Sequence, residues 1–228
     1  EMDDMSTQSL VDMIKDSAQQ KGTGRWTNME ALKQGIDVSM IAAAGNARLM
    51  SNKETRKTAE EHYPRIKIAK IPNHETLIED VRKSLYAAKI IAYAQGFDLL
   101  KQASTAYDWN LPLGKIASIF RAGCIIQAKF LNDITRAYEH EKNLSHLLLD
   151  EVFEKRVISY ENALRQIAAQ AMLSGIPVPA MANAISYLDL FTKNHVGANL
   201  IQAQRDYFGA HTFERIDKDG SFHHEWGK

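Results

Sequence analysis

Prolines are scarce in this chain, and their positions leave long stretches without a helix breaker. The 228 residues contain five prolines, at positions 64, 72, 112, 177 and 179. Because proline ends or kinks an α-helix, each stretch between these positions can form a long helix. After Pro72, apolar residues recur at helical spacing, beginning with Leu77, Val81 and Leu85. We therefore expect an all-α fold, a helical bundle, with a short extended or hairpin tail at the C-terminus.

The breakers also predict where the helices begin and end. Asn73 is a suitable N-cap for the first long helix, which we expect at the centre of the bundle. Thr27 and Glu30 have the spacing of a capping box, and Gly35 is placed to end the helix that they begin. We expect long helices over residues 73–107, 113–138, 144–174 and 179–208.

The length of the chain suits one large domain with a sizeable core. We expect a helical domain over residues 1–211 and a tail over residues 212–228. Within this tail, alternating residues flank Asp219-Gly220, which is a tight-turn pair. The tail is therefore expected to fold back on itself as a small hairpin.

Charge and composition exclude several classes of protein. The 28 Lys and Arg residues balance 28 Asp and Glu residues, so we expect no nucleic-acid partner. No segment is apolar enough for a bilayer span, and residues 1–20 lack the pattern of a signal peptide. The single cysteine, Cys124, favours a reducing compartment, and we expect it to be a buried structural thiol. These features predict a cytoplasmic protein with no membrane partner.

One candidate anion site lies in the sequence QKGTGRWTNME, which begins at Gln20. Gly22 and Gly24 allow the backbone to turn its N–H groups toward an anion, next to the charge of Lys21 and the hydroxyl of Thr23. The spacing is not that of a Walker A loop. A surface turn before a helix explains the same residues, and the pattern alone leaves both interpretations open.

A second candidate is Arg48, in the sequence GNARLMSNKETRK. Ile41, Ala44 and Met50 lie near it in the sequence, which predicts an arginine on a mostly buried helix face. A buried guanidinium needs a carboxylate or a phosphate as partner. An ion pair within the chain and a side chain that reaches solvent are the alternatives.

The third candidate pairs Arg205 with His211 in the sequence QAQRDYFGAHTFER. The two side chains could hold a phosphate or a carboxylate, because His211 can donate a hydrogen bond or gain a charge near neutral pH. A capped helix end at Gly209 is the alternative. His223 and His224 have no second pair of ligands at metal-binding spacing, so we expect tail residues and no metal site.

Several motifs together resemble one enzyme family, from about Gln20 to Trp226. They are KGTGRWT, YAQGFDLL, IFRAGCIIQAKFL, SGIPVPA and ANLIQAQRDYFGAHTFERID. Their order and spacing are similar to those of the C-terminal helical domain of the 6-phosphogluconate dehydrogenases. The resemblance implies that residues 1–211 form a domain for substrate binding and dimerisation.

The resemblance also implies roles for single residues. Lys21, Thr23 and Arg48 match the family's ligands for the phosphate of 6-phosphogluconate. Arg205 and His211 match residues that reach the substrate of the neighbouring subunit, because the family forms homodimers in which the C-terminal segment crosses over. No catalytic residue of the family falls on this chain.

The family's reaction oxidises 6-phosphogluconate with NADP, releases carbon dioxide and yields ribulose 5-phosphate in the pentose phosphate pathway. This sequence lacks the GxGxxG unit of a Rossmann domain, so we expect NADP to be bound mainly by an N-terminal domain that is absent from the chain as given. The family's catalytic lysine and glutamate also precede the KGTG loop. We therefore expect no turnover by this chain alone. A non-catalytic dimerisation or phosphosugar-binding module is the alternative.

Overall fold

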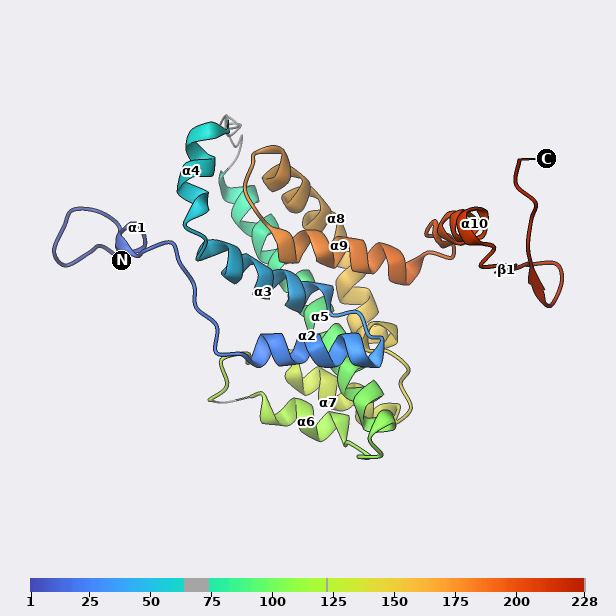
Figure 1. Ribbon diagram of the computed structural model, residues 1–228. Helices are drawn as coiled ribbons and strands as arrows, with labels where there is room; N and C mark the ends of the chain where they lie inside the picture. Colours follow the sequence, from blue (N-terminus) through green and yellow to red (C-terminus); the bar gives the residue numbers. More distant parts are fainter. Residues whose placement is uncertain (64–73, 122, 228) are drawn as a thin grey trace. The chain divides into compact units, whose positions relative to one another are not determined.

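The computed structural model describes residues 1–63, 74–121 and 123–227, and these residues are mainly helical (Figure 1). The chain divides into two compact units, Glu1–Ile185 and Ser186–Lys228. The all-α fold is confirmed, whereas the expected division after residue 211 stays a prediction. Asn73, the expected N-cap, lies outside the described residues.

The helices differ widely in length along the chain. They are α1 (Leu10–Met13), α2 (Thr23–Gln34), α3 (Ser39–Ser51), α4 (Thr55–His62), α5 (His74–Ala106), α6 (Leu113–Ile119), α7 (Leu131–His140), the 3₁₀ turn η1 (Leu147–Leu149), α8 (Glu151–Leu173), α9 (Pro179–Thr192) and α10 (Ala198–Gly209). The strands β1 (Phe213–Glu214) and β2 (Ser221–Phe222) follow. None of the helices in the described part of the chain is both long and apolar enough to cross a membrane.

Helix α5 is the central helix of the first unit, as its length and apolar content predicted. It packs against α8, α2, α6 and η1. Ile90, Ala94 and Phe97 are fully buried, whereas Val81 and Leu85 of the predicted apolar stripe are exposed. The predicted stripe is therefore wrong at these two positions, whereas Ala88, Gln95 and Leu99 further along it are buried, as predicted.

The long helix expected over residues 113–138 is wrong. The structure instead has two short helices, α6 and α7, with irregular chain between them. Gly123 has a φ of 79°, which is outside helical geometry. Phe130 precedes α7, is buried, and packs edge-on against Tyr86 and Phe153. Cys124 in the intervening segment is partly exposed, so the expectation of a buried thiol is also wrong.

Two further long helices differ from the prediction at their ends. Asp150 caps α8, since its side chain accepts hydrogen bonds from the N–H groups of Val152 and Phe153. The helix expected from residue 144 therefore begins later, after η1. Gly197, with a φ of 81°, separates α9 from α10, so one helix over 179–208 is also wrong.

Helix α2 begins earlier than its sequence suggested. Gly22 is the N-cap, and Thr27 lies inside the helix, where its hydroxyl donates to the carbonyl of Thr23. The expected capping box of Thr27 and Glu30 is therefore wrong, because Glu30 instead accepts hydrogen bonds from other side chains. The predicted end at Gly35 is confirmed, with a φ of 69°.

The second unit contains the C-terminal part of α9, helix α10 and the hairpin. The hairpin is antiparallel and pairs Phe213 with Phe222 and Glu214 with Ser221. Gly220 has a φ of 118°, a conformation that favours glycine in the turn. The predicted hairpin is confirmed.

Candidate functional site

Helices α2 and α3 form a helical hairpin in the first unit and run in opposite directions (Figure 1). Buried Ala31, Val38 and Leu99 form a core between this hairpin and α5. Because the connection between the two helices is short, the start of α2 and the end of α3 lie at the same end of the pair. Two of the predicted anion-binding segments therefore lie toward the same end of the hairpin.

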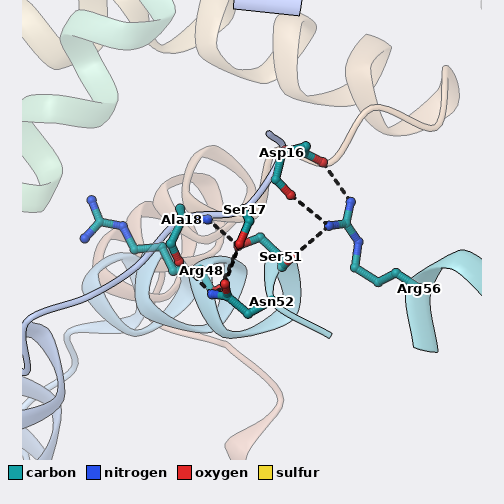
Figure 2. Close-up of polar contacts among 7 residues, drawn as sticks. All are labelled: Asp16, Ser17, Ala18, Arg48, Ser51, Asn52 and Arg56. Carbon is teal, nitrogen blue, oxygen red and sulfur yellow. Dashed lines mark hydrogen bonds and ion pairs between the residues drawn. The ribbon is translucent and has the colours of Figure 1, made fainter. Parts of the chain in front are cut away.

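A hydrogen-bonded clip fastens the chain before α2 to the end of α3 (Figure 2). The N–H of Ala18 donates to Oγ of Ser51 over 2.9 Å. Nδ2 of Asn52 donates to the carbonyl of Ala18 over 2.7 Å, and the hydroxyl of Ser17 donates to Oδ1 of Asn52. Both polar groups of the Ala18 backbone are thus bonded to side chains at the end of α3.

Arg56 adds an ion pair to this clip (Figure 2). Its guanidinium lies 2.9 Å from Oδ2 of Asp16 and also donates to the carbonyl of Ser51 over 3.0 Å. Both charged side chains are well exposed, so the pair contributes at most about 1 kcal/mol. Lys21 follows Ala18 by three residues, which limits their Cα separation to about 11 Å. The clip therefore keeps Lys21 near the end of α3.

The start of α2 is open to an anion. Gly22 has a φ of 100°, and no side chain caps the helix N-terminus. The first N–H groups of a helix carry a positive partial charge and lack partners within the helix. Lys21 and Thr23 are exposed beside them. The features expected of the KGTG segment are therefore present together, although its role in binding stays a prediction.

Arg48 lies in the last turn of α3, with its guanidinium extended from the helix (Figure 2). Its side chain is exposed, as are Ala44 and Met50, so the expected mostly buried face is wrong. The clip residues Ser51 and Asn52 bond to the carbonyl of Arg48 and leave its side chain free. Within the described part of the chain, no carboxylate forms an ion pair with this guanidinium.

Arg205 and His211 lie in the second unit, where both are exposed. Arg205 donates a hydrogen bond to Oε1 of Gln202 over 3.1 Å. His211 lies in the turn that follows α10, and its ring makes no hydrogen bond with a described residue. Both side chains are thus available to a ligand, and their joint role stays a prediction.

Sequence reasoning missed Asp206, which is completely buried. Its Oδ1 accepts from the N–H of Thr212 and contacts Nδ1 of His223, both at 2.9 Å. Its Oδ2 accepts from the N–H of His224 at 3.0 Å and from Nε1 of Trp226 at 2.8 Å. A signal was present in the sequence, since the helix dipole disfavours an acidic residue in the last turn of a helix.

The charge of Asp206 is maintained by these donors. Burial by itself raises the pKa of the carboxyl, but the hydrogen bonds from His224, His223, Trp226 and Thr212 lower it below its ordinary value. Of the two tail histidines, His223 contacts this carboxylate through its ring and His224 through its backbone N–H. Within the described part of the chain, no three His, Cys, Asp or Glu side chains are arranged so that they could hold a metal ion.

Comparison with known proteins identifies the family. Residues 1–226 match the family model described as 6-phosphogluconate dehydrogenase, C-terminal domain. The chain belongs to this family. The resemblance carried by the sequence motifs is therefore confirmed.

Individual relatives of the family are similar over nearly the whole chain. The NADP(+)-dependent, decarboxylating 6-phosphogluconate dehydrogenase of Bacillus subtilis is 48% identical over 99% of the chain and 49% of its own length. The decarboxylating enzyme of Lactococcus lactis is 45% identical over 98% of the chain and 48% of its own length. The chain therefore spans about half the length of these relatives.

A solved structure confirms the fold of the family in this chain. The 6-phosphogluconate dehydrogenase of Plasmodium falciparum, studied without ligands, with its cofactor NADP+ and with its substrate 6-phosphogluconate, is 42% identical. The similarity has a TM-score of 0.93 and covers 99% of this chain and 49% of the other. The helices described above are thus those of a 6-phosphogluconate dehydrogenase C-terminal domain.

Proposed function

We propose that this chain is the C-terminal part of a decarboxylating 6-phosphogluconate dehydrogenase and supplies the site for the substrate's phosphate. The observation that carries the proposal is the clip, which holds the Lys21 segment near the end of α3 and leaves Arg48 unpaired among the described residues. The similarity to enzymes named for this substrate supports it.

The chemistry of this end of the hairpin suits a phosphate monoester. A helix N-terminus stabilises an anion through its N–H groups, and Thr23 adds a hydroxyl donor. Lys21 supplies a compact positive charge, whereas the planar guanidinium of Arg48 can bond two phosphate oxygens at once. Binding the phosphate would fix the distant reacting carbon of the sugar acid, so that binding energy is used for orientation.

Arg205 and His211 are proposed to act on the substrate of a partner subunit in a homodimer. Apolar side chains of α10 support such an assembly, because Leu200, Ile201 and Phe208 are all more than half exposed. An exposed apolar helix face of this kind is typical of a surface that meets another protein. The same helix carries Arg205 and leads directly to His211.

The cofactor proposed from the relatives is NADP, which accepts a hydride from the substrate in dehydrogenases of this kind. The residues described here do not fit it, because their two strands have two residues each and form a hairpin, whereas a dinucleotide site needs a parallel strand–turn–helix unit. We therefore assign none of the described residues to the cofactor and no catalytic step to this chain. A non-catalytic dimerisation or phosphosugar-binding module is the alternative function.

Calorimetric titration of the chain with 6-phosphogluconate tests the phosphate site. Gluconate, which lacks the phosphate, is the matched ligand. We expect Arg48→Ala to weaken the binding of 6-phosphogluconate by about 10- to 100-fold, because a charge-assisted hydrogen bond contributes about 1.5–3 kcal/mol. Lys155→Ala, which removes an exposed cation on α8, is the control and should bind normally.

Arg205→Ala, titrated in the same way, tests the part of the site proposed to come from a partner subunit. Weaker binding by this variant supports an assembled dimer site. Equal affinities for gluconate and 6-phosphogluconate, or an unchanged affinity in Arg48→Ala, would contradict the proposed phosphate site.

A further inference from the structure

We infer that Asp206 is a positioning residue that holds His211 in a fixed place relative to Arg205. The inference rests on the proposed function, because it explains how the second unit presents Arg205 and His211 to a phosphosugar. Asp206 adjoins Arg205 in the sequence and is buried, whereas Arg205 and His211 are exposed. It is therefore placed to act on the site through the backbone and not by touching a ligand.

The turn around His211 has an unfavourable backbone conformation. The residues on either side of it, Ala210 and Thr212, have φ angles of 49° and 64°. This left-handed region is uncommon for residues other than glycine and persists only where surrounding contacts enforce it. Two such residues flanking one histidine mark a turn that must be held in place.

Asp206 provides two of the contacts that hold this turn. Its backbone carbonyl accepts the N–H of Ala210 over 2.8 Å, and its side chain accepts the N–H of Thr212 over 2.9 Å. The residues before and after His211 are thus bonded to the same aspartate. Loss of the carboxylate would release the second of these contacts.

Gln202 joins the same arrangement one turn earlier in α10. Its Nε2 donates to the carbonyl of Thr212 over 2.6 Å, and its Oε1 accepts a hydrogen bond from Arg205. One glutamine therefore contacts both the turn that carries His211 and the guanidinium of Arg205. The positions of Arg205 and His211 are coupled through it.

Gly209 leaves space for the His211 ring. A Cβ atom at this position would lie 3.1 Å from Nε2 and 3.2 Å from Cδ2 of the ring. The ring consequently rests against the bare backbone at the end of α10. Replacement by alanine should displace the ring without removing any hydrogen bond of Asp206.

The remaining contacts of Asp206 anchor the chain terminus to the same point. His223, His224 and Trp226 all direct a donor or a ring nitrogen to the carboxylate. A buried carboxylate is costly unless such donors satisfy it, so the turn and the terminal segment depend on one another. This dependence explains why an acidic residue occupies the end of a helix.

The first test measures the turn without a ligand, in Asp206→Asn of the full chain. Asparagine has the same shape but replaces one acceptor atom with a donor. We expect hydrogen exchange of the Thr212 amide and of the Trp226 indole N–H, followed by NMR, to be at least about tenfold faster, while amides of buried α8 are unchanged. Asp217→Asn, which alters an exposed aspartate of the hairpin loop, is the matched control. Unchanged exchange at Thr212 would overturn the inference.

The second test measures affinity for 6-phosphogluconate in a double-mutant cycle. We expect Asp206→Asn to weaken binding by about tenfold when His211 is present and to have little further effect in the His211→Ala background. Additive losses would show that Asp206 does not act through His211 and would overturn its positioning role.

Gly209→Ala separates displacement of the ring from general loss of structure. It should weaken binding as Asp206→Asn does, yet leave exchange of the Trp226 indole unchanged. Normal binding by this variant would contradict the placement of the ring. Should the unaltered chain fail to bind 6-phosphogluconate, the proposed function fails for this chain, whereas the exchange measurement still decides whether Asp206 holds the turn.

Discussion

His146 is a buried histidine whose protonation is linked to the stability of the first unit. Its Nδ1 accepts the N–H of Leu148, so this nitrogen is unprotonated in the folded chain. Burial lowers the pKa of His146, while the nearby Asp98 opposes the change and Lys101 reinforces it. The pKa of Asp98 is raised, chiefly by its own burial. Both pKa shifts arise because burial disfavours the charged form of each side chain.

We predict that His146→Asn reduces the loss of stability on mild acidification. Since the pKa is lowered on folding, the unfolded chain binds a proton more readily, and the stabilising effect of neutral His146 is complete only above the unfolded pKa of about 6.5. It is lost as pH falls below that value. Asparagine cannot titrate but retains an acceptor for the N–H of Leu148.

Urea unfolding at intervals between pH 7.5 and 5.5, the range suggested by the unperturbed histidine pKa of about 6.5, measures this linkage. The free energy of unfolding should fall less steeply in the variant than in the unaltered chain. Identical slopes would mean that His146 does not contribute to the pH dependence. The raised pKa of Asp98 acts in the opposite direction, because the folded chain then binds a proton more readily than the unfolded chain.

At the scale of elements, capping and short polar contacts decide where helices begin. Asp150 starts α8 through two hydrogen bonds, although periodicity placed the start earlier. The clip between residues 16–18 and the end of α3 likewise has no periodic signal in the sequence. Both features depend on single side chains, so single substitutions can test them.

Asp150→Ala should lower the free energy of unfolding by about 1 kcal/mol, because it removes an N-cap. Thermal unfolding of the variant and of the unaltered chain measures the difference. Glu154→Gln is a suitable control, since it removes a negative charge near the same helix N-terminus but leaves the cap intact. Its effect should be only a few tenths of a kcal/mol. Equal losses in the two variants would contradict the assignment of the cap.

Asn52→Ala should loosen the clip. It removes contacts to Ser17, to Ala18 and to the carbonyl of Arg48, and we expect faster hydrogen exchange in residues 18–22 with about 3- to 10-fold weaker binding of 6-phosphogluconate. Asn162→Ala, an exposed asparagine on α8, is the matched control. Unaltered exchange in Asn52→Ala would show that the clip does not hold this segment.

At the scale of the whole molecule, aromatic packing unites the helices of the first unit. Phe153 of α8 is fully buried and meets Phe130 edge-on, and Phe130 in turn meets Tyr86 and Tyr93 of α5. Aromatic side chains bury large apolar areas, and edge-on pairs add to that stabilisation. This cluster therefore joins α5, α8 and the start of α7.

Phe153→Ala should destabilise the first unit by about 3–5 kcal/mol, since it leaves a cavity in this cluster. Such a loss is a large part of the stability of a typical domain. Denaturant unfolding measures it. Val152→Ala, at an exposed neighbouring position, should change stability by no more than about 0.5 kcal/mol, and a similar loss in both variants would contradict the central place of Phe153.

Turnover is the prediction that concerns the whole chain. We expect purified chain mixed with 6-phosphogluconate and NADP to form no NADPH, because none of the described residues is assigned to the cofactor or to a catalytic step. Absorbance of NADPH follows the reaction. NADPH formation at a rate proportional to the added chain, and absent from a mock purification, would contradict this prediction.

The helical class, the central position of α5, the C-terminal hairpin and the family could all be predicted from the sequence. These follow from breaker positions, apolar periodicity and motif order, which are local properties of the chain. Packing, by contrast, sets the break at Gly123, the exposure of Val81 and Leu85 on α5, and the clip beside Arg48. It also decided the burial of Asp206 under donors that lie up to 20 residues away in the sequence. Such contacts join distant residues, and their energies outweigh local helix preference only once the chain has packed.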